Sequence, residues 1–136
     1  MAARPLPPDL DAMVARANPA VIATVKPDGS PHSVATWYLW EKGRILVNMD
    51  DSRKRLAWMQ PGARVALTVI AEDDFYTHVS FRGTVATLEP DVGLADIDRL
   101  SRAYAGRPYH DRLRPRTSAW IEIDNWHGWQ GAPPKG

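Results

Sequence analysis

Hydrophobic positions in the first third of the chain fall in short β-branched runs separated by turn signals. Residues 20–25 form a compact apolar run, and the Asp28-Gly29 pair behind it supplies the positive φ angles of a tight hairpin. A second strand is predicted over residues 32–40, and a third over residues 44–49 after the turn signal at 41–43. The pattern therefore predicts a three-stranded antiparallel meander.

Helical spacing of apolar residues occurs in three places. A short helix is predicted after the prolines at positions 7 and 8, ending at Asn18-Pro19. A second short helix is predicted over residues 53–59, capped by the polar residues 50–52 and ended by Pro61-Gly62. A longer amphipathic helix is predicted over residues 91–104.

Three further strands complete the expected fold. They are predicted over residues 64–70, 75–88 and 117–123, with Gly83 as a bulge or bend in the long one. Six mainly antiparallel strands leave exposed edges unless the sheet closes, so we expect a mainly β, six-stranded barrel with short flanking helices. One domain is expected over residues 1–136, with an N-terminal arm at 1–10 and a C-terminal tail at 125–136.

Composition restricts the function more than the fold. The 136 residues are 44% hydrophobic with a formal charge of +1, so no overall field favours nucleic acid or a membrane as partner. The absence of cysteine excludes disulfides, zinc–thiolate sites and thiol catalysis. The four histidines show no metal-ligand spacing, so no metal site is expected. The first ten residues resemble neither a signal peptide nor a membrane span, and we expect a cytoplasmic protein.

The segment 48–55 contains the main candidate site. It joins a predicted strand to a predicted helix start, and Ser52 is followed by three cations, Arg53, Lys54 and Arg55. Free N–H groups at a helix start, a hydroxyl and guanidinium forks are typical of phosphate binding. The alternative is a solvated basic helix face capped by the two preceding aspartates, and the spacing does not distinguish these two interpretations.

The predicted second strand offers a surface for a flat ring beside that phosphate site. Small residues are followed there by two aromatic residues, Trp37 and Tyr38. Stacking or edge contact from Trp37, together with backbone amides, would suit an isoalloxazine-like ring system. The alternative is that both aromatic side chains pack in the barrel core or its outer shell.

Five segments, taken in order, resemble one known superfamily. They are residues 21–25, Pro27-Asp28-Gly29, residues 43–48, Ser52-Arg53-Lys54 and Arg64-Val65-Ala66-Leu67. Together with Gly83 they resemble the pyridoxamine 5'-phosphate oxidase-like split-barrel superfamily over residues 20–123. The resemblance implies a split β-barrel that forms a homodimer and holds a flavin-type cofactor at the dimer interface.

The resemblance also implies which residues contact the cofactor. The phosphate is expected on Arg53 and Lys54 and the ring along the predicted second strand, while His78 falls where the FMN oxidases place a glutamine. Together with Arg55, which follows Lys54 in the chain, the expected cofactor contacts are Val34, Ala35, Thr36, Trp37, Val47, Asn48, Ser52, Arg53, Lys54, Arg55 and His78.

One departure from the superfamily pattern bears on the cofactor. The FMN oxidases carry an arginine and a lysine at the ends of the second-strand segment, where this chain has His32 and Trp37. The loss of two cations disfavours FMN and resembles the branch of oxidoreductases that use the deazaflavin coenzyme F420. Arg55 would then serve the longer phosphate and glutamate tail of that coenzyme.

The resemblance thus implies an oxidoreductase that transfers a hydride between reduced F420 and a small conjugated organic substrate. A proton would come from water or from a nearby group such as Tyr38 or His78. The alternatives are an FMN-binding oxidoreductase and a non-catalytic carrier of a cofactor or heme.

Overall fold

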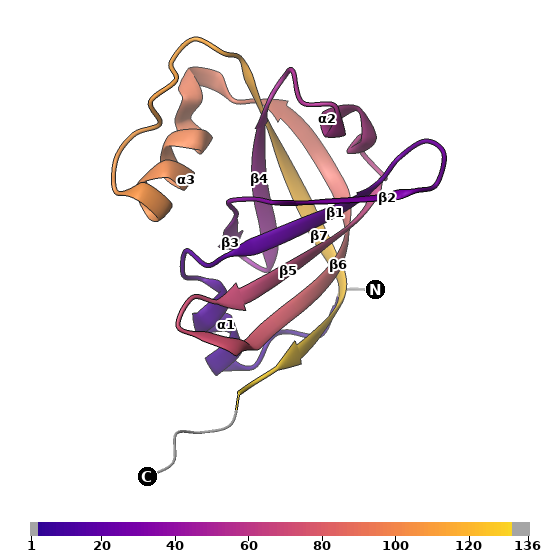
Figure 1. Ribbon diagram of the computed structural model, residues 1–136, viewed down its shortest axis with the longest axis vertical. Helices are drawn as coiled ribbons and strands as arrows, with labels where there is room; N and C mark the ends of the chain where they lie inside the picture. Colours follow the sequence, from indigo (N-terminus) through magenta and orange to yellow (C-terminus); the bar gives the residue numbers. More distant parts are fainter. Residues whose placement is uncertain (1–2, 132–136) are drawn as a thin grey trace.

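The computed structural model describes residues 3–131, and its main element is one sheet of seven antiparallel strands (Figure 1). The strand order is β2-β1-β5-β6-β7-β4-β3. The strands are β1 (Ala20–Val25), β2 (Pro31–Ala35), β3 (Leu39–Glu41), β4 (Arg44–Asp50), β5 (Arg64–Ala71), β6 (Asp74–Pro90) and β7 (Arg116–Trp129). The helices are α1 (Pro8–Val14), α2 (Arg55–Trp58) and α3 (Ala95–Ala105), with a 3-10 turn η1 (Val92–Leu94) before α3. No helix within residues 3–131 is long and apolar enough to cross a membrane.

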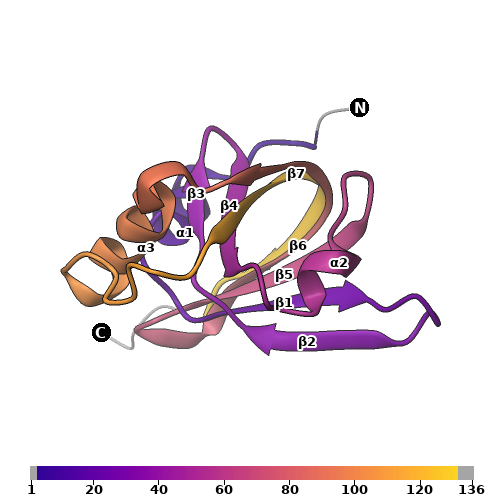
Figure 2. The same ribbon diagram turned by 90° about the horizontal axis from the view of Figure 1, so that it is seen from above.

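The sheet curls around a single hydrophobic core instead of lying flat (Figure 2). β6 and β7 pair along most of their length, and a register shift next to Gly83 interrupts the pairing. A Cβ at Gly83 would lie 2.6 Å from the backbone oxygen of Glu122, so only glycine fits this close approach of two strands. The predicted bulge is therefore confirmed.

The predicted six strands and the three-stranded meander are wrong, because residues 32–40 do not form one strand. β2 pairs with β1 and β3 pairs with β4, and these two short strands are the opposite edges of the sheet. The chain leaves the sheet at residues 36–38. The hydroxyl of Tyr38 is buried and donates to the Val14 carbonyl at 2.7 Å, while the Trp37 ring stacks on Tyr104.

The predicted chain ends also need correction. β7 continues to Trp129, so residues 125–129 belong to the sheet and not to a tail; Trp126 lies opposite Phe81 and Trp129 opposite His78. α1 begins at Pro8, inside the predicted arm. Residues 1–2 of the arm and 132–136 of the tail lie outside the described residues.

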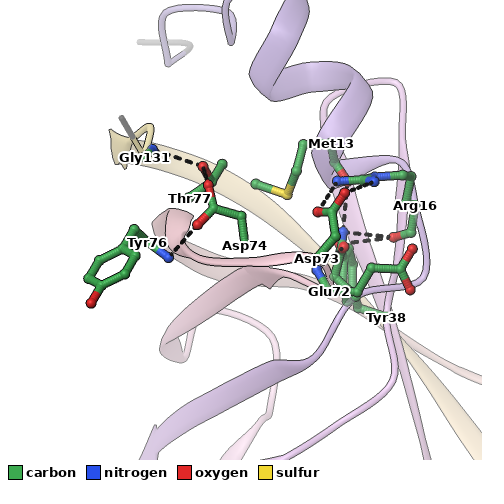
Figure 3. A network of polar contacts seen from close by, with 10 residues as sticks. Met13, Arg16, Tyr38, Glu72, Asp73, Asp74, Tyr76, Thr77 and Gly131 are labelled. Carbon is green, nitrogen blue, oxygen red and sulfur yellow. Dashed lines mark hydrogen bonds and ion pairs between the residues drawn. The ribbon is translucent and has the colours of Figure 1, made fainter. Parts of the chain in front are cut away.

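Polar contacts fasten the end of α1 to the turn between β5 and β6 (Figure 3). Arg16 forms an ion pair with Asp73 at 3.3 Å. The buried amide of Asn18 donates to the Met13 carbonyl at 2.7 Å and accepts the backbone N–H of Glu72 at 3.2 Å. These contacts fix the entry to β1, which forms one wall of the cavity described next.

Candidate functional site

A cavity of about 780 Å³ lies between the β1–β2 hairpin, the end of β4 and α3. This volume is in the range of small-molecule and cofactor sites. Apolar residues form much of its wall, among them Val21 from β1, Val34 and Ala35 from β2 and Leu100 from α3. The charged groups are three arginines and two acids, namely Arg53, Arg55, Arg116, Asp50 and Glu72.

Aromatic side chains make one rigid side of the cavity. The Trp37 and Tyr104 rings stack with centroids 5.2 Å apart and planes 11° apart, and Tyr109 meets Trp37 edge-on at 6.3 Å. The Tyr104 hydroxyl donates to the Asn18 carbonyl at 2.6 Å, and burial raises the pKa of Tyr104. This wall is therefore neutral, and one face of the Trp37 ring is already occupied.

The arginines concentrate positive charge in another part of the cavity, with Arg116 next to the aromatic wall at Tyr109. The Nε of Arg55 is buried and has no hydrogen-bond partner within the described part of the chain. Burial lowers the pKa of Arg55, and the neighbouring charges of Arg53 and Arg116 lower it further. A cation in such surroundings is stabilised when an anion enters the cavity.

Asp50 partly offsets this charge and also shapes the local chain. Its carboxylate accepts hydrogen bonds from the Ser52 hydroxyl and, at 2.9 Å, from the Ser52 N–H, and it pairs with Arg53 at 3.3 Å. The bonds from Ser52 hold the pKa of Asp50 below its usual value, with Arg53 and Arg116 adding to the effect.

The same turn explains why the predicted helix start is misplaced. The bonds between Asp50 and Ser52 close a turn, and α2 begins only at Arg55 and has four residues. The Ser52 hydroxyl is thus used by a neighbouring carboxylate. The helix start therefore lies at Arg55 and not near Ser52.

Arg116 reaches the cavity from the first residue of β7. Its Nε donates to the Oδ1 of Asn48 at 2.6 Å, and its guanidinium carbon lies 4.8 Å from the centre of the Tyr109 ring. The buried Asn48 amide in turn donates to Asp91 at 3.1 Å and to the Ser118 hydroxyl at 3.0 Å. The arrangement holds the guanidinium group in one orientation.

The structure brings most of the predicted contact residues to this cavity but not all of them. Those that line it are Val34, Ala35, Thr36, Trp37, Asn48, Arg53 and Arg55. Val47 is fully buried in the core, and Ser52 and Lys54 are exposed outside the cavity. His78 lies on β6, opposite Trp129, with its Nδ1 3.1 Å from the Tyr76 carbonyl.

Two further expectations change with this geometry. Tyr38 does not line the cavity, and burial raises its pKa to about 12, so it is not placed to donate a proton there. Sequence reasoning missed Tyr104, Tyr109 and Arg116, since each reaches the cavity only through the packing of α3 or the pairing of β7. Within residues 3–131 no group of three His, Cys, Asp or Glu side chains is arranged to hold a metal ion.

Fold and cavity together define a small β protein with a cofactor-sized ligand site bordered by guanidinium groups. The sequence family described as Pyridoxamine 5'-phosphate oxidase matches residues 6–130, so the chain belongs to this family.

Solved structures with the same fold include a protein described as an F420 reductase. It is 25% identical, with a TM-score of 0.79, and the match covers 90% of this chain and 98% of that one. A conserved hypothetical protein from Mycobacterium tuberculosis is 22% identical, with a TM-score of 0.73 and coverage of 98% and 92%. An FAD and heme binding protein from Mycobacterium smegmatis is 18% identical, with a TM-score of 0.66 and coverage of 94% and 73%. No curated protein matches the chain.

Proposed function

We propose that the protein is an oxidoreductase that binds coenzyme F420 in this cavity and passes a hydride from its reduced form to a small conjugated organic substrate. The observation that carries the proposal is the cavity itself, in which an apolar wall for a flat ring adjoins three guanidinium groups for an anionic tail. The 25% identity to a protein described as an F420 reductase supports the same choice.

The residues present divide the binding task between the two sides of the cavity. Val34, Ala35 and Thr36 offer small side chains along which a planar ring fits. Arg53 and Arg55 offer charge-assisted hydrogen bonds to phosphate and carboxylate oxygens. A tail with several negative charges neutralises this cluster better than the single phosphate of FMN, and for this reason we propose F420 and not FMN as the cofactor.

The chemistry of the reaction belongs to the cofactor. A bound reduced deazaflavin supplies a hydride, which carries two electrons, to an electron-poor carbon of the substrate. A proton from water balances the reduction. The contribution of the protein is to hold ring and substrate in contact and to fix the anionic tail.

We propose in addition that the protein acts as a homodimer. The outward face of β1 and β5 carries mostly uncharged residues, with Arg64 as its charged residue at the start of β5, and Val21 and Val25 are 38% and 51% exposed on it. Ala23, Ala66 and Thr68 continue this face between them. Val21 also lines the cavity, so a second copy packed on this face would close the side of the ligand site.

Anaerobic titration of the purified protein with F420 and with FMN, followed by fluorescence, tests the cofactor. F420 is expected to bind more tightly, and oxidation of reduced F420 is expected to depend on an added quinone or nitroaromatic substrate. Tight binding of FMN without binding of F420 would overturn the cofactor proposal. Binding of F420 or heme without substrate-dependent oxidation would identify a carrier instead.

Light scattering after size exclusion tests the dimer. Thr68→Arg places a charge in the middle of the outward face, where the native side chain is half-buried in the single chain. A dimeric wild type and a monomeric, folded Thr68→Arg variant are expected. A monomeric wild type would refute this part of the proposal.

A further inference from the structure

We propose that Arg116 is an oxyanion-binding residue of the cavity and that Asn48 is the residue that positions it. The ligand group is a phosphate or a carboxylate. The inference rests on the proposed function for the identity of the whole ligand, but its oxyanion part stands on the geometry of Arg116 and can be tested separately.

The hydrogen-bonding state of Arg116 leaves most of its donors free. Only Nε is used, in the 2.6 Å bond to Asn48, and no other hydrogen bond or ion pair within residues 3–131 involves the guanidinium group. Its two Nη groups remain, which form the fork that binds oxyanions. Because the group also packs against the Tyr109 ring and lines the cavity, the fork is held at the cavity wall.

Asn48 can face Arg116 only with its oxygen. Its Nδ2 donates to the Asp91 carboxylate and to the Ser118 hydroxyl, at 3.1 and 3.0 Å. Turning the amide over would place an oxygen against the Asp91 carboxylate and a donor against the donor of Arg116. The orientation of the amide is therefore determined by the network, and through it the position of Nε.

The network also ties this position to α3. Asp91 accepts the backbone N–H groups of Asp96 and Ile97, each at 2.9 Å, and the Ser118 hydroxyl donates to Asp96 at 2.7 Å. All of these groups are satisfied by the protein alone. Within this network Arg116 has donors without a partner, and these donors lie at the cavity wall.

A purely structural role for Arg116 would be served better by a carboxylate partner. Two arginines of the preceding loop have such partners, as Arg112 pairs with Asp98 at 2.6 Å and Arg114 with Asp111 at 3.5 Å. Arg116 is held instead by a neutral amide, close enough to Arg55 to lower the pKa of that residue. Arg116 forms no ion pair within residues 3–131, so its positive charge, offset only in part by the nearby Asp50, is available for a ligand.

The test compares Arg116→Gln with Arg107→Gln, a matched control on the loop before β7 whose side chain is exposed, lies outside the cavity and forms no hydrogen bond or ion pair within residues 3–131. Three probes are titrated into each protein by calorimetry: F420, the same deazaflavin ring system without its phosphate and glutamate tail, and inorganic pyrophosphate. Arg116→Gln is expected to weaken F420 and pyrophosphate by about 10- to 100-fold, the loss of a charge-assisted hydrogen bond. The tail-free ring and the control variant are expected to be unaffected.

A double-mutant cycle tests the positioning role. Asn48→Ala is expected to weaken pyrophosphate binding in the wild-type background and to have no further effect in the Arg116→Gln background, because it acts through that guanidinium group. Equal effects in both backgrounds would refute the role of Asn48. If Asn48→Ala fails to fold by near-ultraviolet circular dichroism, Asn48→Ser is used in its place.

The outcomes separate this inference from the proposed function. If F420 binds and Arg116→Gln behaves like Arg107→Gln, the inference is wrong and the proposed function stands. If no deazaflavin binds to any variant, the proposed function fails, and the pyrophosphate titrations alone decide the role of Arg116. Equal weakening of the tail-free ring would also overturn the inference, since it would indicate a general disturbance of the cavity.

Discussion

Replacement of Arg55 by methionine is expected to stabilise the ligand-free protein and to weaken cofactor binding at the same time. The Nε of Arg55 is buried without a hydrogen-bond partner in the described residues. Burial lowers the pKa of this side chain, and the nearby charges of Arg53 and Arg116 act in the same direction. Methionine keeps most of the length and apolar contact of the side chain but carries neither donor nor charge.

The magnitude follows from the unsatisfied donor. An unpaired buried polar group costs about 1–3 kcal/mol, and part of the gain from removing it is lost because methionine fills the site less completely. We therefore expect the free energy of unfolding of Arg55→Met to rise by about 1 kcal/mol. For a domain of this size the melting temperature should rise by about 3–5 °C.

Urea unfolding and calorimetry of the ligand-free protein measure this change. The buffer must contain no phosphate or sulfate, because an anion that binds the native wild type would raise its apparent stability by mass action. Titration with F420 on the same samples measures the loss of affinity, expected to be about tenfold or more.

Arg53→Met is the matched control. The Arg53 side chain is 66% exposed and pairs with Asp50, so its removal should leave stability unchanged or slightly lower while it also weakens binding. A less stable Arg55→Met protein, or an equal gain in stability from Arg53→Met, would refute the claim that Arg55 is strained by its surroundings in the empty cavity.

Three further predictions concern single residues. Tyr38→Phe removes the donor to the Val14 carbonyl and should lower the unfolding free energy by about 1–2 kcal/mol in urea without altering the pH profile of turnover; an altered profile would restore Tyr38 as a proton donor. Gly83→Ala forces a Cβ against the Glu122 backbone and should cost about 1–3 kcal/mol by the same measurement, and an unchanged midpoint would mean that the strands can separate there. Because the pKa of Asp50 is lowered on folding, its contribution to the free energy of unfolding is complete above the unfolded pKa of 3.8 and is lost as the pH falls through the lower folded pKa. Asp50→Asn should therefore be less stable than the wild type at pH 7 and equally stable in acid. A constant difference in stability down to the most acidic pH at which both proteins fold would contradict this.

Most strands and helices could be predicted because their signals are local. β-branched runs, turn residues and the helical spacing of α3 each depend on neighbours in the sequence, and the structure contains an element at every predicted place. The break at residues 36–38 could not be predicted in this way. Trp37 and Tyr38 leave the sheet because of partners on α3 and α1, Tyr104 and Val14, which lie far away along the chain.

The candidate site was predicted only in part, because it too depends on partners that lie far away along the chain. The run of cations after Ser52 indicated positive charge, but its pattern did not separate Arg53 and Arg55, which line the cavity, from Lys54, which does not. Arg53 and Lys54 lie in the turn before α2 and Arg55 is its first residue, so the three side chains differ in direction, whereas the sequence shows only three adjacent cations. Arg116 gave no local signal, because only the pairing of Asp50 with Arg116 across β4 and β7 brings it to the site.

The three cavity arginines differ in the partners that the protein provides for their guanidinium groups. Arg53 has a carboxylate partner and Arg116 a neutral amide, while the Nε of Arg55 has no partner in the described part of the chain. A fold selected only for stability would pair or remove the last of these cations, since buried unpaired charge is destabilising. A ligand that brings the missing negative charge would offset this cost, so the lower stability of the ligand-free protein and the higher affinity for such a ligand would have the same physical origin.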